Sequence, residues 1–303
     1  MLWVERYKRI LVATDGSEHA ELALKRGIYL ALQHSSRLFI CHVVESREYS
    51  RVPVYRDEIK QAAEENGLNI LKESKEKAEK AGLAHVVTII KRDPFPQKKM
   101  AEDVLPLYSI DLVVTGSSGL GPIERYVLGS VSSGMAHHAE CDVLVVRNKN
   151  PLENYQRILI CIDESSMAVN AFTAGLDLAE TQRAEVTAVH VLHTPLVHSL
   201  EQLQEDIQDV YLKNGELLLE KYRELAAEKG NSDIPITLEY GSPKHTIPKE
   251  TAARFQSDLI IAGAVGAGRE KGLRLGSVSE GIVRRADCDV LVIRPRFIMP
   301  IED

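Results

Sequence analysis

The 303-residue sequence lacks a cluster of positive charge, a long apolar run and an N-terminal export signal, and each absence excludes a class of protein. Asp and Glu outnumber Lys and Arg by 44 to 37, which argues against nucleic acid as a partner, because a phosphate backbone needs clustered bases. No run approaches the roughly 20 apolar residues that cross a bilayer, so we expect no membrane insertion. The N-terminus lacks an apolar core followed by a cleavage site, and we expect a cytoplasmic protein.

The sequence also lacks a C-x-x-C motif, although it contains four cysteines. Cys41, Cys141, Cys161 and Cys288 lie in or beside strand-like runs. We therefore interpret them as reduced structural thiols, and we expect no metal site made by side chains.

What the sequence does contain is an internal repeat. ILVATDGSEHA at 10–20 matches ILICIDESSMA at 158–168, so that Asp163 follows Asp15 by 163 − 15 = 148 residues. Farther along the offset falls by one, since CDVLVVR begins at 141 and CDVLVIR at 288, and 288 − 141 = 147. One deletion in a loop explains this change. We predict two duplicated domains, 1–149 and 155–303, separated by a polar stretch around Pro151.

Each half alternates apolar runs with helix-length segments. In the first half, RILVAT, RLFICHVV, HVVTIIK, DLVVTG and DVLVVR are separated by helices predicted near 17–33, 57–80, 97–107 and 130–139. Runs that are apolar throughout are typical of strands buried on both faces, and strands separated by helices form parallel sheets. We predict an α/β protein of two tandem doubly wound domains, each with a five-stranded parallel sheet flanked by helices.

The long helix predicted in the second half carries apolar residues at three-and-four spacing. Its members are Leu203, Ile207, Val210, Tyr211, Leu218, Tyr222 and Leu225. We interpret this stripe as core without a chemical role.

Glycines recur with one spacing in both halves, after the fourth apolar run. The pattern is glycine, two residues, glycine, nine residues and Gly-Ser at the start of a helix. It comprises Gly116, Gly119, Gly129 and Ser130 in the first half, and Gly263, Gly266, Gly276 and Ser277 in the second.

In a doubly wound sheet these glycines lie where ligands bind, at the carboxyl ends of the strands. Glycine lets backbone amides approach an anion, and a helix start offers free N–H groups. Two turns and an N-cap would explain one copy alone, but the shared register in both halves favours a phosphate cradle.

The first strand of each half ends at an aspartate, Asp15 or Asp163. Such a carboxylate can accept hydrogen bonds from two ribose hydroxyls, although an aspartate at this place can also cap the next helix. Val43 and Val191 end the second strands, where backbone groups can contact an adenine edge. The remaining candidate contacts are Ala13, Thr14, Val131, Ser132, Cys161, Ile162, Val278 and Ser279.

The glycine pattern, TDGS after the first strand and the terminal CDVLVVR resemble the universal stress protein family. The resemblance covers essentially the whole chain as two tandem UspA-like domains. It implies a Rossmann-like, adenine nucleotide alpha hydrolase-like fold, binding of ATP or AMP with Mg or Mn held through the phosphates, and a regulatory role in stress through a protein partner. Glu164 in place of the DGS glycine, and Arg92 where the family has Gly before Asp-Pro, depart from the pattern.

Two functions stay open. The first is a nucleotide-binding module that alters a partner surface; the alternative is a slow ATPase or autokinase in which Ser130 or Ser277 accepts a phosphoryl group. No Walker P-loop is present in the sequence. We also expect the two halves to associate through their apolar last strands as an internal pseudo-dimer, with a further homodimer as an open alternative.

Overall fold

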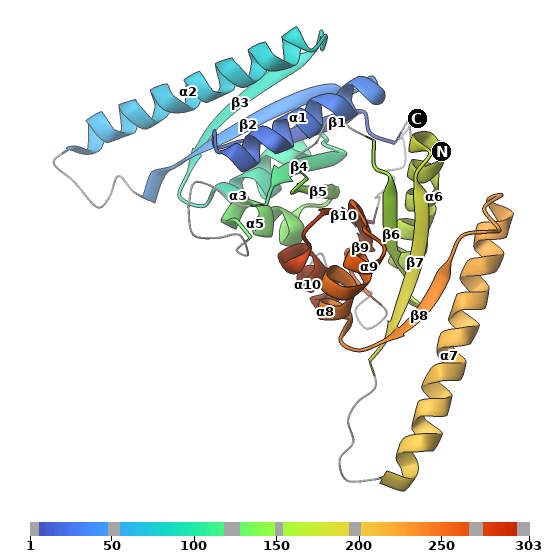
Figure 1. Cartoon of the computed structure of the whole chain (residues 1–303). Coiled ribbons are helices and arrows are strands. Elements are labelled where there is room, and N and C mark those ends of the chain that lie inside the picture. The colour runs from blue at the N-terminus through green and yellow to red at the C-terminus, as the bar shows by residue number, and fades with distance from the viewer. Residues whose placement is uncertain are drawn as a thin grey trace, which may run out of the picture. The chain divides into compact units, whose positions relative to one another are not determined.

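The computed structural model describes residues 6–47, 55–117, 128–148, 154–193, 201–266 and 275–295, without the side chains of 201–208 (Figure 1). The chain divides into two compact units. Unit 1 comprises Met1–Glu153 and Arg294–Asp303, and unit 2 comprises Asn154–Ile293.

Unit 1 is a parallel sheet with helices between its strands. The strands are β1 (Arg9–Ala13), β2 (Arg37–Glu45), β3 (Val86–Asp93), β4 (Leu112–Gly116) and β5 (Asp142–Val146), in the order β3-β2-β1-β4-β5. The helices are α1 (Glu18–Gln33), α2 (Arg56–Lys80), α3 (Pro96–Lys99), the π-helical turn η4 (Met100–Val104), α4 (Leu105–Leu107) and α5 (Ser130–His138).

Unit 2 repeats this arrangement. Its strands are β6 (Arg157–Cys161), β7 (Glu185–Leu192), β8 (Ile236–Tyr240), β9 (Leu259–Gly263) and β10 (Asp289–Ile293), in the order β8-β7-β6-β9-β10. Its helices are α6 (Ser166–Gln182), α7 (Glu201–Glu228), α8 (Pro243–His245), the π-helical turn η5 (Thr246–Thr251), α9 (Ala252–Arg254) and α10 (Ser277–Arg285). The predicted fold class, two tandem doubly wound domains, is confirmed.

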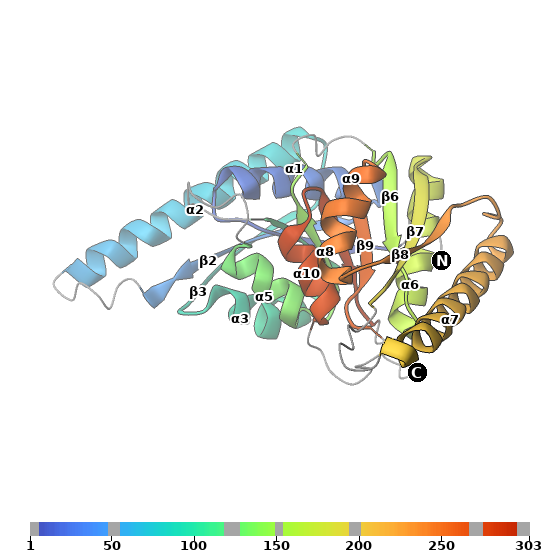
Figure 2. The same cartoon turned by 60° about the horizontal axis from the view of Figure 1, so that its bottom comes forward.

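The central strands form the core of each unit. Ile10, Leu11 and Val12 of β1 are completely buried, as are Ile260 and Ile261 of β9. Right-handed crossovers place α1 and α2 on one face of the first sheet and α3 and α5 on the other, which Figure 2 shows. The chain changes direction along the sheet between β1 and β4, so the carboxyl ends of these strands form the switch point where such folds bind ligands.

The one-residue change in the repeat offset falls between the third strand and the next helix. Strand pairing joins Val43 to Lys91 and Val191 to Glu239, and 239 − 91 = 148. The next helices begin at 96 and 243, and 243 − 96 = 147. The deletion therefore lies in a turn and leaves both sheets in register.

The prediction that the apolar stripe on α7 belongs to the core is wrong for the first turns whose side chains the structure describes. Val210 is 59% exposed and Tyr211 39%, whereas Leu218 and Tyr222 are buried. Leu225 is half-buried, and the side chains of Leu203 and Ile207 lie outside the described residues. A helix of 28 residues is about 42 Å long, but the five-residue strand β8 is only about 17 Å long, so the periodic pattern outlasts the sheet that it could cover.

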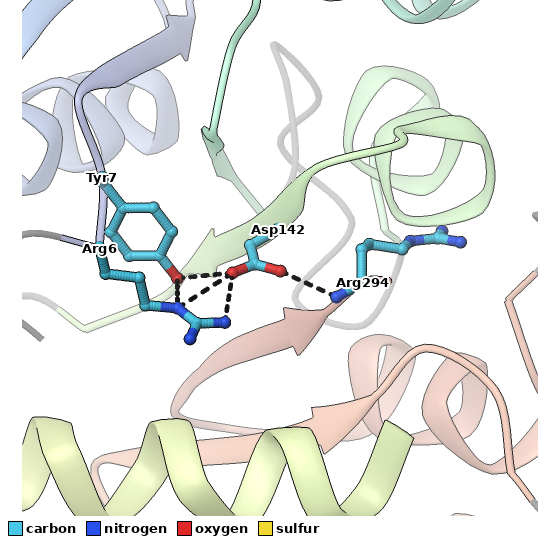
Figure 3. A network of polar contacts seen from close by, with 4 residues as sticks. All are labelled: Arg6, Tyr7, Asp142 and Arg294. Carbon is cyan, nitrogen blue, oxygen red and sulfur yellow. Dashed lines mark hydrogen bonds and ion pairs between the residues drawn. The ribbon is translucent and has the colours of Figure 1, made fainter. Parts of the chain in front are cut away.

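A buried polar network joins two residues before β1, Arg6 and Tyr7, to Asp142 at the start of β5 and to Arg294 (Figure 3). One oxygen of Asp142, Oδ2, accepts hydrogen bonds from the Tyr7 hydroxyl at 2.9 Å and from Nη2 of Arg6 at 2.9 Å. The other, Oδ1, accepts the backbone N–H of Arg294 at 2.8 Å. Burial and the charge of Asp142 raise the pKa of Tyr7 well above its ordinary value, so the hydroxyl keeps the proton that it donates. Unit 2 has a related contact, from the Tyr155 hydroxyl to Asp289 at 2.8 Å.

The cysteines are free thiols. Burial raises the pKa of Cys41 to about 12, and it also raises the pKa of Cys141 and Cys161. Within the described ranges, no group of three His, Cys, Asp or Glu residues is placed to hold a metal ion. No described helix is both long enough and apolar enough to cross a membrane.

Candidate functional site

Unit 1 has a cavity of about 400 Å³ at the carboxyl ends of β1, β2 and β4. Apart from Gly119, which lies outside the described residues, all the residues predicted for the first site line it. They are Ala13, Thr14, Asp15, Val43, Gly116, Gly129, Ser130, Val131 and Ser132.

Unit 2 has a cavity of about 420 Å³ at the corresponding place. The residues predicted for the second site all line it: Cys161, Ile162, Asp163, Val191, Gly263, Gly266, Gly276, Ser277, Val278 and Ser279. Residues at equivalent positions of the repeat, 148 or 147 apart in the sequence, therefore line the cavity of each unit.

The last helix of each unit, between its fourth and fifth strands, begins at the cavity with free amide groups. Gly129 and Gly276 are the N-cap residues of α5 and α10, and no described side chain caps either helix. The first helical amides, at 130–132 and 277–279, therefore have no carbonyl one turn earlier within the helix. Together with the helix dipole they form a site suited to an anion. Ser277 does not cap α10; it is the exposed first residue of the helix.

Backbone and side-chain hydrogen bonds hold each helix start against the end of the fourth strand. The amide of Gly129 donates to the carbonyl of Ser117 at 2.9 Å, and that of Gly276 to the carbonyl of Ala264 at 2.7 Å. The buried hydroxyl of Ser279 donates to the Gly263 carbonyl at 2.6 Å, and the hydroxyl of Ser132 contacts the Gly116 carbonyl at 2.5 Å. The hydroxyls of these two serines thus fasten helix to strand.

The glycines of the motif serve different physical purposes. A Cβ on Gly116 would lie 2.5 Å from the backbone oxygen of His19, and one on Gly263 would lie 2.9 Å from Cβ of Met167. These two glycines let the first helix of each unit pack against a strand end. A Cβ on Gly276 would meet protein atoms only at 3.4 Å or more, so the described fold leaves room there.

The first-strand aspartates do not cap the following helices. Ser17 is the N-cap of α1 and accepts the amide of Ala20, and Ser165 has the same role in α6. Oδ1 of Asp15 instead accepts the amide of Ser17 at 3.0 Å. The half-buried carboxylate of each aspartate lines its cavity, which leaves it available to a ligand.

Matching histidines support the same loop from the second strand. Nδ1 of His42 donates to the carbonyl of Thr14 at 2.8 Å, and Nδ1 of His190 donates to that of Ile162 at 2.9 Å. The carbonyl can only accept, so this nitrogen carries a proton. The two histidines line the cavities and fix the residue that precedes each aspartate.

Other lining residues were not predicted from the sequence. In unit 1, Ile59, Ala63 and Asn66 of α2 line the cavity, and Met100 of η4 does so as well. Ile247 of η5 has the corresponding place in unit 2. A π-helical turn at the same place in both units is a feature often found at functional sites, but no residue type announces it in the sequence.

The fold and these cavities define a tandem α/β protein with one ligand-sized cavity at the switch point of each unit. Comparison with known proteins gives the family: the model of the universal stress protein family matches residues 6–147 and again 154–294. The chain belongs to the universal stress protein family.

Known proteins match either about half of this chain or nearly all of it. A Staphylococcus epidermidis protein of the same family is 38% identical over 153 residues, which are 50% of this chain and 90% of that protein. Two solved structures match nearly the whole chain. A functionally unknown protein from Pseudomonas aeruginosa has a TM-score of 0.69 at 20% identity, with 96% of this chain and 94% of that one covered. A universal stress protein from Archaeoglobus fulgidus has a TM-score of 0.63 at 22% identity, with 94% and 98% covered.

Proposed function

We propose that each unit binds one adenine nucleotide, ATP or AMP, and that the bound state controls association with a regulatory protein partner. The observation that carries the proposal is the repetition of one arrangement in both units. A free helix start, an available carboxylate and the buried end of the second strand surround a cavity of about 400 Å³ in unit 1 and about 420 Å³ in unit 2. This is the size range of small-molecule sites.

Each part of the cavity suits a different part of the nucleotide. The amides at the starts of α5 and α10 suit the phosphates, and Asp15 and Asp163 suit the ribose hydroxyls. Val43 and Val191 do not end the second strands as predicted, since β2 continues to Glu45 and β7 to Leu192. Both valines nevertheless line the cavities near the strand ends, where backbone groups can pair with the adenine edge. Mg or Mn would be held through the phosphates, because the described residues offer no ligand cluster of their own.

Titration of ATP into the full chain is expected to give two sites. Gly276→Val should remove one of them, since a branched side chain would fill the space beside the α10 amides where a phosphate is expected. Gly129→Val should remove the other. Isothermal calorimetry measures both stoichiometries, and far-UV circular dichroism verifies that each variant stays folded.

Two results would contradict this proposal in different ways. Two sites in either valine variant would mean that the glycine serves only the turn. With γ-labelled ATP, release of labelled phosphate well above that of the double valine variant would favour the slow ATPase instead, and transfer of the label to the chain would favour the autokinase.

We further propose that 1–149 and 155–303 are the domains and that they associate through their last strands. β5 and β10 consist of apolar residues after their first aspartate, and each lies at the end of its own unit's sheet order. An apolar edge strand exposed to water invites pairing with another chain. Each half expressed alone should therefore form dimers, which sedimentation velocity can detect. A stable monomer of either half would refute the association.

A further inference from the structure

The loop after the first strand is built differently in the two units. In unit 1, Gly16 follows Asp15 and has a φ of +80°, a conformation that favours glycine. In unit 2, Glu164 takes this position and does not have a positive φ. The two loops therefore differ in backbone conformation at this position, and the two carboxylates are held by different sets of contacts.

The carboxylate of unit 2 has an additional hydrogen bond. Oδ1 of Asp163 accepts the amide of Ser165 at 2.8 Å and also its hydroxyl at 2.5 Å. The same hydroxyl accepts the amide of Ala168 at 3.1 Å, so it connects the carboxylate to the first turn of α6. In unit 1, within the described ranges, Oδ1 of Asp15 accepts only the amide of Ser17.

Tyr222 adds a second support that is specific to unit 2. Its hydroxyl, on α7, donates to the backbone carbonyl of Asp163 at 2.9 Å. The ring is buried and packs edge-on against Phe172 of α6, with centroids 4.9 Å apart. Burial and the charge of Asp163 raise the pKa of Tyr222, so the hydroxyl stays protonated and can donate. The residue 148 positions earlier is Ser74, whose side chain is far shorter.

These contacts leave the other carboxylate oxygen free at the cavity. Oδ2 of Asp163 lies 2.6 Å from the Cβ position of Gly266, so it lies directly against the backbone of the glycine motif. Both residues line the cavity. Oδ1 is occupied by Ser165, and the main chain of Asp163 is fixed by Tyr222. The position of Oδ2 is therefore fixed, and this oxygen can accept a hydrogen bond from a ligand in the cavity.

We propose that Tyr222 is a positioning residue that makes the unit 2 site selective for ribonucleotides over 2′-deoxyribonucleotides. The inference rests on the proposed function, in which Asp163 accepts the ribose hydroxyls. A carboxylate that is held rigidly cannot turn to compensate for a missing hydroxyl, so the deoxy sugar leaves it without a hydrogen bond. A carboxylate that can rotate loses less binding free energy when the hydroxyl is missing, because it can find another partner. Unit 1 should discriminate less, because Asp15 has fewer supports.

The experiment compares ATP with 2′-deoxyATP at one site at a time in the full chain. The Gly129→Val background leaves the unit 2 site for titration, and the Gly276→Val background leaves that of unit 1. At the unit 2 site, ATP is expected to bind about tenfold more tightly than 2′-deoxyATP, as suits one hydrogen bond to a charged group. Tyr222→Phe should reduce this ratio to about threefold or less.

The ratio separates positioning from a merely structural effect. Phenylalanine keeps the ring and its contact with Phe172, so the fold should survive; equal weakening of both nucleotides would mean a structural role and would overturn the inference. Ser165→Gly loses the second support and should also lower the ratio, while glycine remains an acceptable N-cap. Ser74→Ala is the matched control in unit 1 and should leave the ratio there unchanged.

Failure of the proposed function gives a different result. If ATP does not bind to the Gly129→Val chain at all, the nucleotide site of unit 2 is refuted and the inference with it. If ATP binds but Tyr222→Phe keeps the wild-type ratio, only the inference is overturned.

Discussion

Gly116→Ala is expected to lower the free energy of unfolding by about 3 kcal/mol, and Gly263→Ala by about 1 to 2 kcal/mol, because overpacking forces the backbone to shift. The new Cβ of Gly116→Ala would lie 2.5 Å from the backbone oxygen of His19 and 2.6 Å from its carbonyl carbon. Both atoms belong to the main chain of α1 and cannot rotate away as a side-chain end could. In Gly263→Ala the nearest atom is Cβ of Met167 at 2.9 Å, followed by its backbone carbon at 3.0 Å.

Gly276→Ala is the matched control for this ranking. Its Cβ would meet the carbonyl oxygen of Ala264 at 3.4 Å, an ordinary contact, so only the N-cap preference should be lost, at a cost of about 0.5 kcal/mol. Urea denaturation of the three variants gives the order directly. Equal stabilities for Gly116→Ala and Gly276→Ala would show that the first helix moves away from the strand end without cost.

The repeat made most of the fold predictable from the sequence. Short apolar runs such as RILVAT are typical of strands buried on both faces, and each run recurs in the second half with its helix. Agreement between the two copies excludes many of the secondary-structure assignments that one copy alone would allow. The pattern on α7 was less informative, because periodicity shows which face a helix could bury and not where the opposing sheet ends. Val210 and Tyr211 therefore continue the stripe without being buried.

The candidate site was predictable where residue type and position coincide. Glycines at a strand exit and an aspartate after the first strand identify the edge of the sheet at which the cavity lies. The reason for each glycine was not predictable: Gly116 fits against the backbone of His19, a contact between segments about 100 residues apart. The contacts of Tyr222 with Asp163 and of His42 with Thr14 likewise need the tertiary fold.

Asp142→Ala is expected to lower the free energy of unfolding of the full chain by about 3 kcal/mol, since it removes one partner of a buried ion pair. The side chain of Asp142 is 1% exposed, and that of Arg6, its partner at 2.9 Å, is 17% exposed. Without the carboxylate, the buried hydroxyl of Tyr7 and the buried amide of Arg294 also lose their hydrogen bonds to Asp142. Arg6 can reach water in part, so we place the loss at the lower end of the range for buried pairs.

Asp287→Ala is the control for Asp142→Ala, because it breaks an ion pair of similar length at the surface. Lys249 and Asp287 are 2.8 Å apart, but the Asp287 side chain is 76% exposed. Such pairs contribute about 0.2 to 1 kcal/mol, since water solvates each charge when the other is removed. Urea denaturation should therefore separate the two variants by about 2 kcal/mol or more. Similar losses in both would mean that the carboxylate of Asp142 is replaced by water when it is removed, and that its burial contributes little to stability.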